Sequence, residues 1–242
     1  MFEKLIHQFK KRKAGACAAV IVAAGQAARM QGEDKILLEL DGRSVIDRTI
    51  ALFQNSAMVT EIVIVTNAER MGYIRSLCKA KGYSKVLAIA EGGRTRVHSV
   101  MNGLSQVSNK NGLVAIHDGA RPLVTPEIID DTISKAVTYH AVAPAIPVKD
   151  TIKTAQNHIV TGTPDRAALF AVQTPQVFDY DLLRGALQKA LEANTPITDD
   201  CSAVEALGMS VYLSKGSEEN IKITTPLDVT LAEAILQRRN HC

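Results

Sequence analysis

Apolar runs and amphipathic segments alternate along much of the chain. The apolar runs, rich in Val, Ile and Ala, occupy residues 18–23, 61–66, 85–90, 113–117 and 141–147. Between them apolar side chains recur three and four positions apart, as at Ile46, Ile50 and Phe53. These helical segments cover residues 44–55, 68–81, 95–107 and 126–139. The pattern predicts an α/β fold, a doubly wound, mainly parallel sheet covered on both faces, whose ligands bind at the carboxyl ends of the strands.

The pattern changes after Pro147. Residues 148–170 carry short polar alternations around Gln156 and Asn157, which predict a β-hairpin arm that projects from the sheet. The remaining expected elements are a strand near residues 171–173, helices at about 181–192 and 199–206, a strand at 210–213 and a closing helix from Pro226. No internal repeat or low-complexity linker separates these parts, so residues 16–242 are predicted to form a single domain that includes the arm.

The stretch VIVAAGQAARMQGEDK at residues 20–35 admits two interpretations. Because the basic KKRK of residues 10–13 precedes an apolar run over residues 14–25, the segment has features of a secretory signal peptide. Alternatively, it is a buried strand followed by a loop that binds phosphate. The apolar run fits the first strand of a complete α/β domain, so we favour the strand.

Residues 1–15 form a basic, amphipathic N-terminal extension outside this domain. Its apolar residues, Phe2, Leu5, Ile6 and Phe9, share one face of a predicted helix. Such a helix could bind a membrane surface or a partner protein. Packing on its own subunit is the interpretation we favour.

Composition narrows the class of protein. The 242 residues are 46% hydrophobic and 22% charged, which is typical of a globular chain with a sizeable core. A net charge of +3, without a basic stripe in the domain, argues against a nucleic-acid partner. The four cysteines have no metal-ligand spacing, and reduced thiols in the cytoplasm are expected. No apolar run approaches the roughly 18 residues of a membrane span, so no membrane partner is expected.

The loop after the first predicted strand contains candidate phosphate ligands. It matches neither G-x-G-x-x-G nor G-x-x-x-x-G-K-[ST], which argues against dinucleotide-binding and P-loop classes. It does contain A-A-G-x-x-x-R-M followed by Lys35. Backbone N–H groups near Gly25 could bind a triphosphate, while Arg29 and Lys35 neutralise charge on the transferred phosphoryl group. Alternatively, both cations are ordinary solvated charges.

Two other predicted strands end in polar or glycine-containing segments. His117 and Asp118 close one strand, and Gly119 permits close backbone approach after it. An Asp at this place suits a Mg²⁺ or ribose contact, whereas His117 is expected to be a core residue. The Gly-Gly turn at residues 92–93 follows another strand, and Ser99 lies on the next predicted helix.

An ordered set of motifs resembles one known family. The motifs are A-A-G-x-x-x-R-M at residues 23–30, G-G-x-x-R-x-x-S-V at 92–100, H-D-x-A-R-P at 117–122, P-V-K-D-T-I-K at 147–153, D-R at 165–166, Q-T-P-Q at 173–176, I-T-D-D at 197–200 and N-I-K-I-T at 220–224. From about Ala18 to the last helix, the chain resembles the 2-C-methyl-D-erythritol 4-phosphate cytidylyltransferases of the non-mevalonate isoprenoid pathway. The resemblance implies a Rossmann-like nucleotidyltransferase that transfers a cytidylyl group from CTP to methylerythritol phosphate and releases pyrophosphate.

The resemblance also implies roles for individual residues. Arg29 and Lys35 would stabilise the transition state, and Arg166 and Lys222 would position methylerythritol phosphate. The expected contacts of cytidine and the triphosphate are Ala23, Ala24, Gly25, Gly93, Ser99 and Gly119. The expected substrate side comprises Asp118, Arg121, Thr151, Thr174 and Thr198.

The family uses a divalent metal, usually Mg²⁺, held mainly by the CTP phosphates, with Asp118 as the candidate protein ligand. Family members dimerise through the arm, so this chain is expected to be a homodimer in which Thr151 and Arg166 act on the neighbouring subunit's site. Alternatively, the arm packs on its own domain.

Some residues depart from the family pattern. Ala27 stands where the family loop commonly has a second glycine, and residues 34–36 read Asp-Lys-Ile where many members have Pro-Lys-Gln.

The string R-M-x-G-x-D-K-x-L-L also resembles guanylyltransferases, although the downstream motifs argue against them. Ribitol-5-phosphate cytidylyltransferase is the nearest alternative, and Ala120 favours methylerythritol phosphate over it. A non-catalytic nucleotide-binding module is the alternative from another class.

Overall fold

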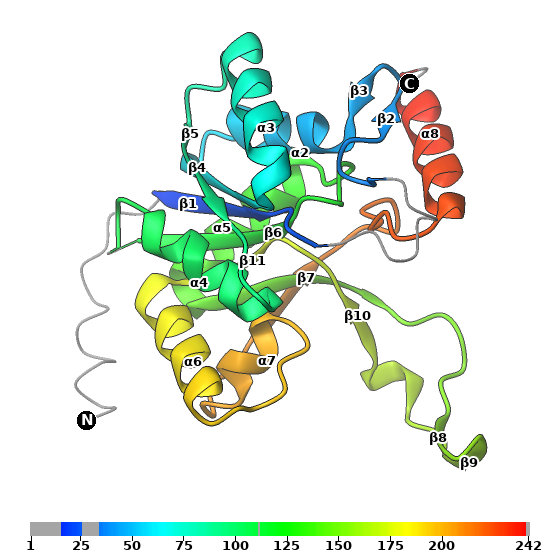
Figure 1. Cartoon of the computed structure of the whole chain (residues 1–242). Coiled ribbons are helices and arrows are strands. Elements are labelled where there is room, and N and C mark those ends of the chain that lie inside the picture. Colours follow the sequence, from blue (N-terminus) through cyan, green and yellow to red (C-terminus); the bar gives the residue numbers. More distant parts are fainter. Residues whose placement is uncertain (1–15, 26–33, 111, 241–242) are drawn as a thin grey trace.

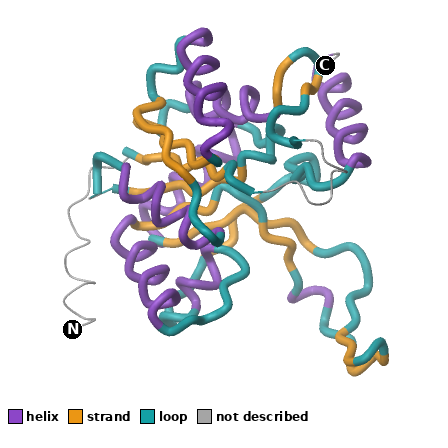
Figure 2. Tube along the Cα trace, viewed as in Figure 1, coloured by secondary structure: helices purple, strands orange, loops and turns teal. Residues whose placement is uncertain are grey.

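A mainly parallel sheet forms the centre of the protein, with helices on both faces (Figures 1 and 2). The computed structural model describes residues 16–25, 34–110 and 112–240. The predicted N-terminal extension, Ala27 and Arg29 lie outside these residues. The sheet strands are β1 (Cys17–Val22), β4 (Val59–Thr66), β5 (Val86–Glu91), β6 (Leu113–Asp118), β7 (Ala141–Pro147), β10 (Phe170–Val172), β11 (Gln176–Asp179) and β12 (Tyr212–Lys215).

The strand order confirms the doubly wound α/β prediction. It runs β10-β7-β11-β6-β1-β4-β5, and β12 pairs with β7. Strand β1 pairs in parallel with both β4 and β6, and β4 pairs in parallel with β5. Residues 17–22 are therefore a central strand, which is the interpretation favoured over a signal peptide.

The described chain contains seven helices. They are α2 (Val45–Asn55), α3 (Ala68–Lys81), α4 (Arg96–Gln106), α5 (Pro126–Tyr139), α6 (Tyr180–Glu192), α7 (Asp200–Glu205) and α8 (Pro226–Asn240). Six of them flank the sheet, and α8 packs beside the short strands β2 (Glu39–Leu40) and β3 (Arg43–Ser44). The residue before α2, α3, α4 and α5 is Ser44, Asn67, Thr95 and Thr125 respectively, and in each case its side chain accepts a hydrogen bond from the third helical N–H. Such caps satisfy backbone donors that have no partner within the helix.

The alternation of side chains along β1 divides the core into two layers. Cys17, Ala19 and Ile21 pack with α2, α3 and α5 on one face. Ala18 and Val20 pack with α4, α6 and α7 on the other. Successive side chains of a strand point to opposite faces, so a strand must be apolar throughout to bury both. A third, smaller cluster joins α8 to Leu40 and Leu123.

Residues 148–169 leave the sheet after β7 and return as β10. Within them β8 (Thr154–Gln156) and β9 (Ile159–Gly162) pair antiparallel as a separate two-stranded sheet. Asn157 and His158 join the strands with φ of 50° and 64°, and positive φ at both central residues is typical of a type I′ hairpin turn. Figure 1 shows this hairpin well away from the central sheet.

Two features of the sheet and its surroundings were not predicted. β11 runs antiparallel between β6 and β7, interrupting the parallel order. A small hairpin of β2 (Glu39–Leu40) and β3 (Arg43–Ser44) precedes α2 and turns at Asp41 and Gly42, both with positive φ. The last strand also begins two residues later than expected, at Tyr212. Among the described residues, no helix combines the length and apolar character needed to span a bilayer.

Candidate active site

A pocket of about 590 Å³ opens at the carboxyl ends of the parallel strands. Its residues come from the segments after β1, β5 and β6, from the turn before β2 and from the loop before α8. The lining residues are Val22, Ala23, Ala24, Gly25, Lys35, Ile36, Gly93, Arg94, Thr95, Arg96, Ser99, Asp118, Ala120 and Lys222. This is the edge at which open α/β sheets bind ligands.

Close backbone approach shapes one wall of the pocket. A Cβ atom on Gly92 would lie 2.3 Å from Cβ of Ala24, and one on Gly119 would lie 3.0 Å from Cβ of Ala23. The side chain of Ser99 reinforces this wall, because its hydroxyl accepts a hydrogen bond from the Gly93 N–H at 3.0 Å. Small residues are therefore required here, and they leave the backbone exposed to a ligand.

Asp118 is the centre of a charged cluster. Its carboxylate lies 2.8 Å from Lys222 Nζ, 3.7 Å from Arg96 Nη2 and 3.8 Å from Arg121 Nε. Burial by itself would raise the pKa of Asp118, but the nearby cations outweigh it and lower the pKa to about 2. Asp118 is thus an anion at any physiological pH, surrounded by excess positive charge.

Arg96 connects this cluster to a second, fully buried carboxylate. Its Nη1 lies 2.7 Å from Oδ2 of Asp200, whose side chain is 0% exposed. Burial raises the pKa of Asp200, and Arg96 opposes that shift. Neither Asp200 nor Arg96 was predicted as a site residue. Both occur in the quoted motifs, as the arginine of G-G-x-x-R and the last aspartate of I-T-D-D, but only their pairing identifies them.

A neutral histidine supports Asp118 from behind. A carbonyl oxygen can only accept, so His117 Nε2 donates to the Arg121 carbonyl oxygen at 3.2 Å. His117 Nδ1 then accepts from the Thr174 hydroxyl at 3.1 Å, and that hydroxyl oxygen accepts from the Asp118 N–H at 3.1 Å. Burial lowers the pKa of His117 to about 4. His117 is therefore a core residue, as expected, and it sets the position of the Asp118 backbone.

The loop that carries Lys222 is held by a buried amide network. Asn220 is 0% exposed, and its Nδ2 donates to Oε1 of Gln173 and to the carbonyl oxygen of Thr174. Arg121 Nη1 donates to the carbonyl oxygen of Asn220 at 2.7 Å. The backbone N–H of Ile223 donates to the carbonyl oxygen of Ala120 at 2.8 Å. Hydrogen bonds thus fix Asn220 and Ile223 on either side of Lys222, although Lys222 belongs to no helix or strand.

The structure gathers some of the predicted site residues and leaves others outside the pocket. Those that line it are Ala23, Ala24, Gly25, Lys35, Gly93, Ser99, Asp118 and Lys222. Gly119, Arg121 and Thr174 lie directly behind the lining residues. Thr151, Arg166 and Thr198 are exposed and do not line the pocket of their own chain.

The chain is similar to cytidylyltransferases of known sequence and structure. The sequence profile of the family described as IspD, 2-C-methyl-D-erythritol 4-phosphate cytidylyltransferase, matches residues 17–238. The protein of that name from Caldanaerobacter subterraneus is 45% identical over 223 residues, covering 91% of this chain and 98% of its own. The one from Clostridium novyi is 42% identical over 227 residues, covering 93% and 98%.

Solved structures of enzymes with these names are also similar to this chain over most of its length. The 4-diphosphocytidyl-2C-methyl-D-erythritol synthase of Anaerococcus prevotii superposes with a TM-score of 0.83 at 30% identity, covering 93% of this chain and 97% of its own. The 2-C-methyl-D-erythritol 4-phosphate cytidylyltransferase of Thermus thermophilus gives a TM-score of 0.74 at 31% identity, covering 90% and 98%. With a profile match over nearly its whole length and relatives above 40% identity, this chain belongs to the 2-C-methyl-D-erythritol 4-phosphate cytidylyltransferase family of nucleotidyltransferases.

Proposed function

We propose that this enzyme transfers a cytidylyl group from CTP to 2-C-methyl-D-erythritol 4-phosphate, giving 4-diphosphocytidyl-2-C-methyl-D-erythritol and pyrophosphate. The observation that carries the proposal is the pocket, in which Lys35, Arg94, Arg96 and Lys222 surround a glycine-rich wall in a chain of this family. Two polyanionic substrates must meet for the reaction, and a site dominated by cations is suited to bringing them together.

The chemistry needs no covalent enzyme intermediate, because the substrate phosphate is already an anionic nucleophile at neutral pH. Its oxygen forms a bond to the α-phosphorus of CTP while the bond from that phosphorus to the pyrophosphate oxygen breaks. Charge develops on the oxygens around phosphorus, and Lys35 is the described pocket cation that we assign to it, together with Arg29. We assign Lys222 to the incoming phosphate, because its side chain lines the pocket beside Asp118 and is 40% exposed.

We expect the pocket wall to bind the nucleotide. Ala23, Ala24 and Gly25 would present backbone N–H groups to the triphosphate, as small residues allow. Gly93, Ser99 and Gly119 would leave room for the cytidine. On the substrate side, Asp118 lines the pocket, whereas Arg121 and Thr174 lie behind it and would act on the substrate through Asp118. Thr198 stays a predicted contact.

A divalent metal, Mg²⁺ or a similar ion, fits the donor set of the pocket. Asp118 is the one carboxylate among its described lining residues, and Mg²⁺ in phosphoryl-transfer sites is commonly bound by one or two carboxylates together with substrate phosphates. The metal would neutralise charge on the phosphates when bound. Binding it would require Asp118 to exchange part of its pairing with Lys222 and Arg96.

We further propose a homodimer formed through the arm of residues 148–170. This segment exposes apolar side chains that its own domain does not cover: Ile152 at 40%, Ile159 at 71%, Val160 at 57% and Phe170 at 44%. Arg166 and Thr151 belong to the same exposed segment. A neighbouring subunit would bury the apolar residues and receive Arg166 and Thr151 at its own pocket.

The reaction is tested by measuring pyrophosphate release from CTP and Mg²⁺, with methylerythritol phosphate and ribitol 5-phosphate in separate assays. We expect release with methylerythritol phosphate. Release with ribitol 5-phosphate alone would replace the substrate, and no release with either would contradict the enzyme assignment. We expect the reaction to occur in the cytoplasm, which the free thiols of Cys17, Cys78 and Cys201 support.

The role of the arm is tested by mixing two inactive variants, Lys35→Ala and Arg166→Ala, after reversible dissociation. If Arg166 acts in the neighbouring subunit's pocket, each mixed dimer contains one pocket with both residues intact, and about a quarter of all sites recover activity. If Arg166 acts in its own subunit, every pocket lacks one residue and the mixture stays inactive.

A further inference from the structure

Arg70, on the first turn of α3, is a nearly buried cation that no part of the reaction so far uses. Its side chain is 8% exposed. Arg70 Nη1 donates to the carbonyl oxygen of Ala23 at 2.8 Å, and its Nε pairs with Oδ2 of Asp34. Arg70 itself does not line the pocket. Arg70 therefore connects the backbone of Ala23, directly after β1, with the side chain of Asp34, the residue before Lys35.

Asp34 organises the turn that carries Lys35. Its Oδ1 accepts a hydrogen bond from the Ile36 N–H at 3.1 Å, and its carbonyl oxygen accepts from the N–H groups of Leu37 and Leu38. Ile36, on the other side of Lys35, is 2% exposed and belongs to the core. The backbone of Lys35 is thus fixed by a carboxylate before it and a buried side chain after it, and Arg70 holds the carboxylate.

The second contact of Arg70 is with the backbone directly after β1. Ala23 lines the pocket directly after β1, and its N–H donates to the carbonyl oxygen of Val65 in β4 at 2.7 Å. Ala23 is therefore an extension of the rigid sheet. A single guanidinium group therefore fixes the turn of Lys35 relative to this sheet, although ten residues separate Ala23 from Asp34 along the sequence.

Charge gives a second reason for this arrangement. The carboxylate of Asp34 directly precedes the cation that we assign to the α-phosphate. Left unpaired, it would compete with phosphate for Lys35 and repel the triphosphate. Arg70 neutralises it from the side of α3, away from the pocket lining.

We propose that Arg70 is a positioning residue for Lys35: it fixes the turn of Lys35 relative to Ala23 and keeps Asp34 from pairing with that lysine. This inference rests on the proposed function. A planar guanidinium can serve a carbonyl and a carboxylate at the same time with donors of fixed geometry, whereas a lysine ammonium cannot hold both in that relation. Arg70→Lys therefore keeps the charge and removes the bridge.

The test is a double-mutant cycle on kcat, measured at a high enzyme concentration so that slow variants remain measurable. Arg70→Lys is made in the wild-type and in the Lys35→Ala background. We expect kcat to fall about tenfold to a hundredfold in the first, with KM for methylerythritol phosphate within about twofold of wild type. In the second we expect less than about a twofold change, because the residue through which Arg70 acts is gone.

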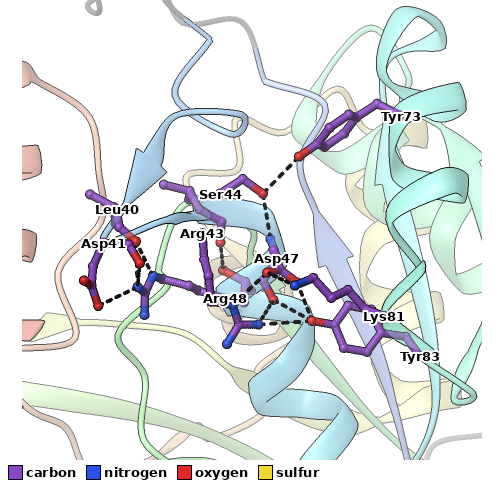
Figure 3. A network of polar contacts seen from close by, with 11 residues as sticks. Leu40, Asp41, Arg43, Ser44, Asp47, Arg48, Tyr73, Lys81 and Tyr83 are labelled. Carbon is purple, nitrogen blue, oxygen red and sulfur yellow. Dashed lines mark hydrogen bonds and ion pairs between the residues drawn. The ribbon is translucent and has the colours of Figure 1, made fainter. Parts of the chain in front are cut away.

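Arg43→Lys is the matched control. Arg43 also bridges a carboxylate and a carbonyl oxygen, those of Asp47, and donates to the Tyr83 hydroxyl at 3.2 Å (Figure 3). This network joins α2 to the chain after α3 and does not line the pocket. Arg43→Lys should lower the thermal unfolding midpoint and leave kcat per folded molecule unchanged, which separates a loss of stability from a loss of positioning.

Equal losses of kcat in both backgrounds, or an unchanged kcat for Arg70→Lys, would overturn the inference while the proposed function stands. If Lys35→Ala is too slow to measure, Asp34→Asn replaces it in the cycle, and the same non-additivity is expected because Arg70 acts on Lys35 through Asp34. Absence of pyrophosphate release by the wild-type enzyme would overturn the proposed function and the inference together.

Discussion

Replacing Arg96 by methionine should separate the stability of this protein from its activity. Arg96 lines the pocket and is the ion-pair partner of Asp200, whose side chain is 0% exposed. Apart from Arg96, no described residue donates a hydrogen bond to the carboxylate oxygens of Asp200. Arg96→Met keeps most of the side-chain volume but leaves a buried carboxylate without its counter-ion, a change that typically costs about 3 to 5 kcal/mol.

The magnitude has an upper limit, because Asp200 can escape its unpaired state by taking up a proton. The pKa of Asp200 in the unfolded chain is near its ordinary value of 3.8, so protonation at pH 7 costs about 4 kcal/mol at roughly 1.4 kcal/mol per pH unit. At pH 5 the same limit is about 2 kcal/mol. Without Arg96 the folded-state pKa of Asp200 is raised further, so the variant gains stability relative to wild type as the pH falls from 7 towards 4.

The assay is urea unfolding of wild type, Arg96→Met, Asp200→Asn and the double variant at pH 7 and pH 5, with pyrophosphate release measured in parallel. In the double variant the side chain at position 200 is neutral and Asp118 keeps Lys222 and Arg121 as partners, so the variant should recover most of the lost stability at pH 7. It should not recover activity, because the cation at the pocket is still absent. We expect kcat/KM for CTP to be lowered at least about tenfold in both variants that lack Arg96.

Two results would refute this reasoning. A pH-independent loss of stability in Arg96→Met would show that an unpaired Asp200 is not its cause. Recovery of activity in the double variant would show that Arg96 acts only by supporting the fold.

Three further predictions concern residues around the pocket. Burial lowers the pKa of His117 from 6.5 to about 4, so its contribution to the free energy of unfolding is fully present above pH 6.5, and about 3 kcal/mol of it is lost as the pH falls to 4. Urea unfolding of His117→Gln across this range should lack that part of the pH dependence. A pH dependence identical to that of wild type would contradict the prediction. Gly92→Ala places a Cβ 2.3 Å from Cβ of Ala24 and should cost about 1 to 3 kcal/mol and raise KM for CTP, whereas Gly72→Ala, with nothing within 4 Å, should be neutral or stabilise α3 by up to about 1 kcal/mol in thermal unfolding. Asn220→Ala removes two buried donor contacts and should cost about 2 to 3 kcal/mol while lowering kcat through the Lys222 loop; an unchanged kcat in the folded variant would argue against that positioning.

Local pattern was sufficient for most of the elements, because burial on both faces requires strands that are apolar throughout. The bounds of α3, α5 and β7 coincide with the predicted segments, and β1, β4, β5 and β6 differ from theirs by at most two residues at either end. β11 was missed because QVFD is a four-residue run without a distinctive period. The β2–β3 hairpin was missed although Asp41-Gly42 is a typical type I′ turn sequence, because only two residues pair on each side.

The candidate site, like the fold, was predicted from the sequence only in part. Motifs along the sequence identified the lining residues Lys35, Asp118 and Lys222, whose residue types suit phosphate and metal chemistry. They did not identify the pairing of Arg96 with Asp200 or that of Arg70 with Asp34, because a charged residue acquires such a role from a partner far along the chain. Sequence spacing carries no information about which loops meet at one edge of a sheet.

The sequence by itself therefore determined the class of fold, the central strand at residues 17–22 and the family resemblance, since each depends on residue types in local order. The tertiary structure alone decided that five separated segments form one pocket, that Asp118 lies among three cations, and that Thr174 and His117 stand behind it. The physical reason is that charge and desolvation depend on distance in space, which the chain acquires only when the sheet brings its carboxyl ends together.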